Sequence, residues 1–322
     1  QNLPRCTHSF LSPHLTSSCR AMSASRAPSA DRLQALLKPN PEEVVQAVGS
    51  LYDDELKPFG RVLLKRVREL AAARILGPDA VLDPDSMPRV NPKRLRQICE
   101  ASDRLSVAPE DRREYSVLLL GLPCRFVDVC SPEDPYPMEL WAEMAAHFGG
   151  RGCEQIVLPG GRYACAQVLK TRALQFLQGR SLGELCHIVQ LAISPHKILG
   201  YLQGHLVPYV CSEEWAKKQF AVQHQPVCTA KRPTPLLPIA GWHEARACLR
   251  AILDKSGSIT LSNVKRLFRS QFSMDLSETV LGHSRLIELL QDENFRDICA
   301  VQMEGNGQVV VRRAEGPRGG AA

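Results

Sequence analysis

Hydrophobic residues recur at helical spacing in three segments between residues 242 and 290. Within each segment the apolar positions lie three or four residues apart, which places them on one face of an amphipathic helix. The positions are Leu249, Ile252 and Leu253; Leu261, Val264, Leu267, Phe268 and Phe272; and Leu286, Leu289 and Leu290.

Two short strands are predicted directly after these helices. The segments 298–303 and 308–311 flank Gly305-Asn306-Gly307, and an Asn-Gly pair readily adopts the positive φ angles of a tight hairpin turn. Three helices followed by a β-hairpin form a winged helix-turn-helix, a fold commonly used to bind nucleic acid or a partner protein. We therefore predict a winged helix over residues 241–313, followed by a disordered tail over 314–322.

A similar order of elements is predicted over residues 40–130. Helices are expected from Pro41, from Pro58 to Leu76 and after Asn91-Pro92, because proline and asparagine favour helix starts. Apolar runs at 114–120 and 125–130 are predicted to be strands. The sequence thus predicts a helical α+β unit here. Because the order of helices and strands repeats that of the C-terminal stretch, one interpretation of this unit is a divergent second winged helix.

Residues 131–225 are predicted to form a mostly helical region, so the whole chain is expected to be α+β and mostly helical. Ser181, with Glu184 three residues later, is a capping box at the start of one of these helices. Four prolines between residues 226 and 240 indicate a linker. The other predicted elements are a short strand over 152–158 and helices over 138–148, 163–177 and 213–223, and from Ser194-Pro195 through Leu202.

Composition narrows the class of protein only modestly. The 322 residues have room for two or three domains, and no apolar run approaches the ~18 residues of a membrane-spanning helix, so no membrane partner is expected. The net charge of +6 is compatible with an acidic partner such as RNA, without establishing one. The twelve scattered cysteines contain no C-x-x-C pair, which favours reduced thiols in an intracellular protein. We expect a cytoplasmic protein, with ribonucleoprotein granules or the nucleus as alternatives.

The first 30 residues contain no acidic side chain, seven serines and three arginines. Such a composition occurs in organelle transit peptides. The favoured interpretation is a disordered leader over residues 1–39, or upstream sequence with Met22 as the true start.

The sequence contains no P-loop, dinucleotide fingerprint, G-x-S-x-G or H-E-x-x-H motif, so we predict no catalytic residue, no metal and no cofactor. Asp128, close to Glu133 and Asp134, leaves a metal-dependent nuclease as an alternative. Cys186 and His187 are adjacent on a predicted helix and so point in different directions, which disfavours a catalytic dyad. Gly160-Gly161-Arg162 precedes a helix, where a plain turn is favoured over a phosphate site.

Basic residues gather on the predicted winged helix. Between residues 255 and 285 there are five bases and only two acids. Lys265, Arg266 and Arg269 are expected on the solvent side of the second helix, and Arg285 at the start of the third. Arg312 and Arg313 follow the wing. Each can contact phosphate, and the alternative is an ordinary solvated face.

The stretch 242–311 resembles the OST-HTH domain, also called LOTUS. The residues that carry the resemblance are Ala247–Leu253, Gly257–Leu261 and the run Gly282-His283-Ser284-Arg285-Leu286-Ile287-Glu288-Leu289-Leu290. The last run matches the family's Gly-x-x-(Lys/Arg)-Leu-x-x-Leu-Leu element, and the closing hairpin matches as well.

The resemblance implies one of two functions. Some members of the family bind RNA, including G-rich RNA, whereas others carry an extra C-terminal helix and bind a DEAD-box helicase. Gly316-Pro317 and Gly319-Gly320 disfavour such a helix here, so we expect the RNA-binding form. The alternative is a protein–protein scaffold that binds a helicase or another ribonucleoprotein partner. The predicted RNA-binding residues are Lys265, Arg266, Arg269, His283, Ser284, Arg285, Arg312 and Arg313.

Overall fold

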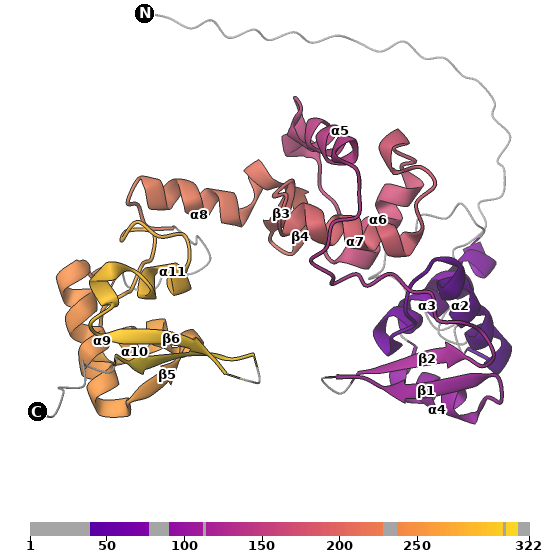
Figure 1. The fold of residues 1–322 in the computed structure, drawn as a ribbon, viewed down its shortest axis with the longest axis horizontal. Helices are drawn as coiled ribbons and strands as arrows, with labels where there is room; N and C mark the ends of the chain where they lie inside the picture. The colour runs from indigo at the N-terminus through magenta and orange to yellow at the C-terminus, as the bar shows by residue number, and fades with distance from the viewer. Residues whose placement is uncertain (1–38, 77–89, 112–113, 228–236, 305–306, 315–322) are drawn as a thin grey trace, which may run out of the picture.

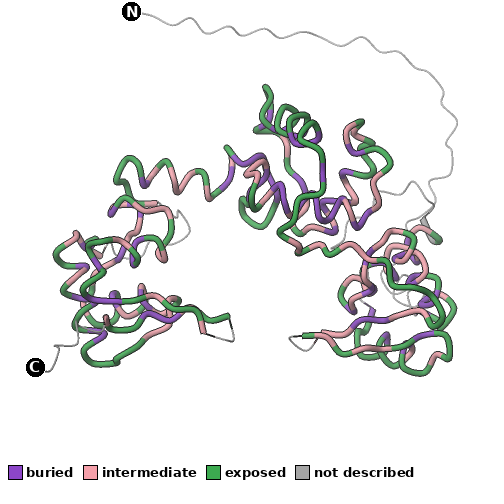
Figure 2. The backbone as a smooth tube through the Cα atoms, in the orientation of Figure 1, coloured by how far each residue is buried: buried purple, intermediate pink, exposed green. Residues whose placement is uncertain are grey.

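A computed structural model describes residues 39–76, 90–111, 114–227, 237–304 and 307–314 (Figure 1). These residues form an α+β protein with three small antiparallel sheets, in agreement with the predicted fold class. Buried side chains gather into two hydrophobic cores, one extending from Val44 to Leu206 and the other from Ala240 to Val311 (Figure 2). The predicted leader with Met22, most of the linker and the predicted tail lie outside the described residues.

The N-terminal unit consists of three helices followed by a β-hairpin. Asn40 and Asn91 cap the first and third helices through their side chains, each with proline at the first helical position. This order of elements is that of a winged helix, and we propose that interpretation for the unit. The elements are α2 (Pro41–Asp53), α3 (Gly60–Leu76), α4 (Pro92–Ala101), β1 (Leu105–Pro109) and β2 (Tyr115–Leu119).

The predicted strand over residues 125–130 is wrong. This segment crosses the end of α2, where the Val127 amide donates to the Glu55 carbonyl (2.9 Å), and it joins no sheet. The partner of β2 is instead β1, which the sequence analysis missed. That strand is short and ends at Pro109, so its apolar alternation covers too few residues to stand out.

The middle of the chain packs on the same core as the N-terminal unit, so one core crosses the predicted division at residue 131. The Ser181 capping box at α7 is confirmed. The elements are α5 (Met138–Gly149), η2 (Cys153–Gln155), α6 (Arg162–Thr171), η3 (Gln175–Leu177), α7 (Leu182–Ile193), β3 (Leu199–Leu202), β4 (His205–Pro208), η4 (Tyr209–Cys211) and α8 (Glu213–Val222).

Three predictions in this region are wrong. The helix expected from Ser194-Pro195 is a β-hairpin, because Gln203 and Gly204 both adopt positive φ angles (50° and 87°) and reverse the chain. The helix expected over 163–177 ends at Thr171, two residues before Ala173 takes a φ of 49°. The strand expected over 152–158 is a 3-10 turn followed by a single bridge between Leu158 and Leu206.

The C-terminal unit is the predicted winged helix. The predicted apolar positions Leu249, Ile252, Phe268 and Leu289 are all fully buried in the second core. Its sheet has the order β5-β7-β6, so the wing strand β7 lies in the middle. The elements are α9 (Trp242–Ser256), β5 (Ser258–Thr260), η5 (Leu261–Asn263), α10 (Val264–Phe272), α11 (Leu286–Leu290), η6 (Glu293–Phe295), β6 (Cys299–Met303) and β7 (Val309–Arg313).

A buried arginine joins the N-terminal helices to α6. The Arg66 guanidinium donates to Asp54 Oδ2 (2.6 Å), Ser50 Oγ (2.9 Å) and Tyr163 Oη (3.1 Å), and Lys170 Nζ donates to Asp54 Oδ1 (2.8 Å). Burial raises the pKa of Asp54, but the hydrogen bonds from Lys170 and Arg66 outweigh burial and leave that pKa below its ordinary value. The carboxylate therefore stabilises the fold when it is ionised.

We expect Asp54→Asn to lower the free energy of unfolding by about 2 kcal/mol at pH 7, because charged hydrogen bonds are lost. Since the folded pKa is depressed, the wild-type advantage is complete above the unfolded pKa of about 3.9 and disappears as the pH falls through the folded pKa. Urea denaturation at several pH values measures the difference. Glu100→Gln, which removes the exposed pair with Arg96, is the control and should leave the stability close to that of the wild type. A deficit independent of pH would contradict this account.

Candidate functional site

A groove of about 570 Å³ lies on the winged helix between the start of α10, the start of α11 and β7. Four apolar side chains line it, together with two of the predicted RNA-binding residues, Lys265 and Arg285. The lining residues are Leu261, Ser262, Lys265, Arg285, Leu286, Ile287, Gln308 and Val309. The structure thus brings α10, α11 and the wing to one surface.

Most of the predicted RNA-binding cations are already paired with acids. Lys265 forms an ion pair with Glu278, and Arg269 makes two hydrogen bonds to Asp275 (both 3.0 Å). Beyond the groove, Arg312 pairs with Glu304 (2.9 Å) and Arg313 with Asp254 (3.1 Å). The excess of bases that the sequence shows locally is therefore reduced by acids that the fold brings close.

Arg266 differs from these residues. It lies one residue after Lys265 on α10, its side chain is exposed, and it makes no ion pair within the described part of the chain. Among the predicted cations of the winged helix it is the one whose charge is not offset in this way. Arg266 is therefore the member of the predicted set best placed to meet an anionic ligand.

His283 and Ser284 serve the structure of the loop before α11. His283 Nε2 lies 3.0 Å from Asp292 Oδ2, and its ring meets Trp242 edge to face. Ser284 Oγ donates to Glu288 (2.9 Å). Both side chains thus have partners inside the domain, and they hold the loop that positions Arg285.

Helix α8 packs against this loop from outside the winged helix (Figure 1). Glu214 Oε1 lies 3.0 Å from Arg285 Nη2, and His224 Nδ1 lies 3.1 Å from the Val280 carbonyl oxygen. Gly282, with a φ of 86°, leaves 3.0 Å between an ideal Cβ and the His224 ring, so a larger residue would strain this contact.

This contact was missed in the sequence analysis. Glu213 and Glu214 suggested only a polar helix, and nothing in the spacing of the two segments signals that they meet. The structure adds Glu214 to the residues that control the groove, because it neutralises Arg285 at the start of α11.

Two of the three acids considered for a nuclease have polar partners within the protein. Asp128 Oδ1 accepts from the Cys130 amide (2.9 Å), and Asp134 Oδ2 lies 2.7 Å from His196. Within the described ranges, no group of three or more His, Cys, Asp or Glu residues could hold a metal ion. No helix in the part of the chain that the structure describes is both long enough and apolar enough to cross a membrane.

Cys186 and His187 lie in the first core. His187 bridges Tyr136 Oη and the Ser131 carbonyl oxygen at 3.1 Å each. Burial raises the pKa of the Cys186 thiol to about 12, so the reactive thiolate is scarce at neutral pH. The two side chains act as core residues with separate partners.

Comparison with known proteins finds two matching family models in the chain. The family model of the OST-HTH/LOTUS domain matches residues 243–311, and that of the OST-HTH Associated domain matches residues 153–225. A stretch of 152 residues is 28% identical to the protein PFF0380w of Plasmodium falciparum. That stretch is 46% of this chain and 5% of the relative, so the chain spans a small part of that protein's length.

The matched ranges coincide with folded elements described above. The Associated domain runs from η2 to the end of α8, and the OST-HTH/LOTUS match runs from α9 to β7. Residues 243–311 therefore belong to the OST-HTH/LOTUS family, and the segment that packs against them through α8 is an OST-HTH Associated domain.

Proposed function

We propose that this chain is a non-catalytic adaptor that binds RNA through the groove of its winged helix and acts in the cytoplasm or in ribonucleoprotein granules. OST-HTH/LOTUS domains are RNA-binding or protein-interaction modules. The observation that supports the RNA proposal most directly is Arg266 of α10, an exposed arginine free of ion pairs in the described structure, which follows the groove residue Lys265 in the chain but is not itself part of the groove lining. Lys265 and Arg285 line the groove itself, where an RNA phosphate can replace their carboxylate partners Glu278 and Glu214.

The acids near the groove reduce its positive charge but do not prevent an RNA phosphate from binding there. Exposed ion pairs contribute only about 0–1 kcal/mol, so an RNA phosphate can replace a carboxylate at modest cost. The Arg285 side chain is 54% exposed and its pairs with Glu214 and Glu288 lie at the surface. We therefore expect affinity that is moderate and strongly dependent on salt.

The apolar part of the groove favours a second candidate function, the binding of a protein partner such as an RNA helicase. Leu261, Leu286, Ile287 and Val309 offer a surface on which the apolar side chains of a partner can pack. Gly316-Pro317 and Gly319-Gly320 disfavour the extra helix of the helicase-binding form. They lie in residues 315–322, outside the described part of the chain. Binding measured on purified components, with RNA and helicase tested separately, distinguishes the two candidates.

Arg266→Glu should weaken RNA binding several-fold at low salt, because one phosphate contact is replaced by repulsion. The slope of log K against log salt should become shallower by about 0.7–1 for the lost contact. Fluorescence anisotropy with G-rich and unstructured RNA oligonucleotides measures both quantities. The matched control is Arg296→Glu, which reverses another exposed arginine outside the groove lining. Equal affinity for wild type and both variants would refute RNA binding at this groove.

Glu214→Gln should raise RNA affinity about two- to fivefold, because it removes a negative charge 3.0 Å from Arg285. The control is the neighbouring Glu213→Gln, whose carboxylate instead accepts a hydrogen bond from the Gln203 amide. The same anisotropy titration compares the two variants. If Glu214→Gln and Glu213→Gln bind RNA equally, Arg285 takes no part in the contact.

A further inference from the structure

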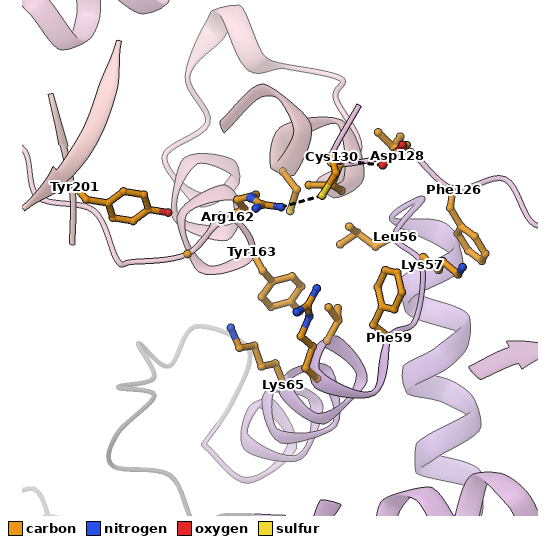
Figure 3. Close-up of a pocket in the computed structure, with 16 residues that line it drawn as sticks. Leu56, Lys57, Phe59, Lys65, Phe126, Asp128, Cys130, Arg162, Tyr163 and Tyr201 are labelled. Carbon is orange, nitrogen blue, oxygen red and sulfur yellow. Dashed lines mark hydrogen bonds between the residues drawn. The ribbon is translucent and has the colours of Figure 1, made fainter. Parts of the chain in front are cut away.

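A larger pocket lies between the N-terminal helices and the Associated domain, far from the winged helix in sequence (Figure 3). Its volume is about 720 Å³, within the range of small-molecule sites. Its walls come from the α2–α3 connection, the first turns of α3, residues 126–130, the start of α6 and strand β3. Leu56, Tyr163 and Cys186 of the lining also belong to the first hydrophobic core, which joins the elements that form the walls.

The pocket is rich in positive charge. Lys57, Arg61, Lys65 and Arg162 line it, against one lining acid, Asp128. Lys57 pairs with Glu110 (2.6 Å), and Arg61, 73% exposed, lies 3.8 Å from Glu114. Counting these two outer acids as well, the pocket keeps a positive excess, in contrast to the largely neutralised groove of the winged helix.

Two of these cations, Arg162 and Lys65, form no ion pair in the described structure. Arg162 Nη1 donates to the Cys130 thiol at 3.3 Å, and the Lys65 ammonium lies 5.6 Å from the centre of the Tyr163 ring. Figure 3 shows both side chains bordering the same space. A thiol and an aromatic ring are weak partners for a full positive charge, so an anion entering here would gain two charge-assisted contacts.

Aromatic rings border the same space. Phe59, Phe126, Tyr163 and Tyr201 all line the pocket, although aromatic residues make up only 6% of the chain. Tyr201 projects from β3 and is 43% exposed, so part of the side chain is accessible to a ligand. Every nucleobase has a flat face that stacks on such a ring without regard to its identity.

We propose that this pocket binds one nucleotide of a single-stranded RNA, with its phosphate at Lys65 and Arg162 and its base stacked on an aromatic ring of the wall, Tyr201 first among them. Arg61 and Lys57 continue the positive surface at the outer edge, where the phosphates of adjacent nucleotides can lie. This continuation favours a strand over a free mononucleotide. The proposal extends the proposed RNA-binding function but uses none of the winged-helix residues.

The first test follows the Cys130 thiol in the full-length wild-type chain. Cys130 is exposed, lines the pocket and touches Arg162, whereas Cys124 is exposed and lies outside the lining. A saturating unstructured RNA pentamer should slow the alkylation of Cys130 by iodoacetamide about fivefold or more and leave Cys124 unchanged. An unchanged Cys130 rate, or equal protection of both thiols, overturns the proposal.

The second test measures affinity for the same pentamer. Tyr201→Ala and Arg162→Gln should each weaken binding about fivefold or more, in line with the loss of one stacked base or one phosphate contact. The controls are Leu202→Ala on the same strand and Arg296→Gln on the winged helix, and both should bind as wild type does. Wild-type affinity in the two pocket variants refutes the site.

Two further comparisons separate the alternatives. Protection of Cys130 by adenosine monophosphate but not by the pentamer would assign the pocket to a free nucleotide and overturn the RNA assignment. If the pocket variants lose affinity while Arg266→Glu does not, the winged-helix function fails and the pocket proposal stands. If Arg266→Glu loses affinity while the pocket variants do not, the winged-helix function is supported alone and the pocket proposal is overturned.

Discussion

The first core of the protein depends on one buried guanidinium. Arg66 is only 8% exposed, and its hydrogen bonds reach α2 through Ser50 and Asp54 and α6 through Tyr163. Taking such a charge out of water is costly, and the cost is recovered only when every partner is in place. The network therefore fixes the orientation of α6 against the N-terminal helices, which hydrophobic packing alone would leave less specified.

That orientation decides what the Associated domain can do. Tyr163 follows Arg162 at the start of α6, so the same helix that completes the Arg66 network also forms one wall of the cationic pocket. At the C-terminal end of the domain, α8 contacts the winged helix. The Associated domain thus shares a core with the N-terminal unit and contacts the OST-HTH/LOTUS domain through polar groups.

The parts of the fold that sequence predicts well are those specified by local chemistry. Asn40, Asn91 and Ser181 cap helices through their own side chains, and the apolar stripe of α10 is set by helical spacing alone. The hairpin at β3 and β4 was missed because Ile198, Leu199 and Leu202 also fit a helix, and the turn at Gln203-Gly204 lacks the usual Asn or Asp.

The groove of the winged helix was predictable only in part, because some of the contacts that define it join segments far apart in the sequence. Spacing identifies Lys265 and Arg285 as solvent-facing cations, but their charge depends on Glu278 and Glu214, which come from other parts of the chain. Arg162 was visible in the sequence only as the end of a Gly-Gly-Arg turn. Its pairing with Cys130 requires two segments 32 residues apart to meet, and no pattern in either segment reports that.

The contact of His224 with Gly282 has a consequence for how the family's domains are compared. Gly282 belongs to the element by which the domain is recognised, yet here its small size leaves room for a residue of the neighbouring domain. A winged helix cut out at residue 243 would expose Gly282 to solvent and would leave Arg285 without Glu214, with only Glu288 of its own domain as an acidic partner. Binding preferences of isolated and connected domains then describe two different molecular surfaces, even where their sequences are identical.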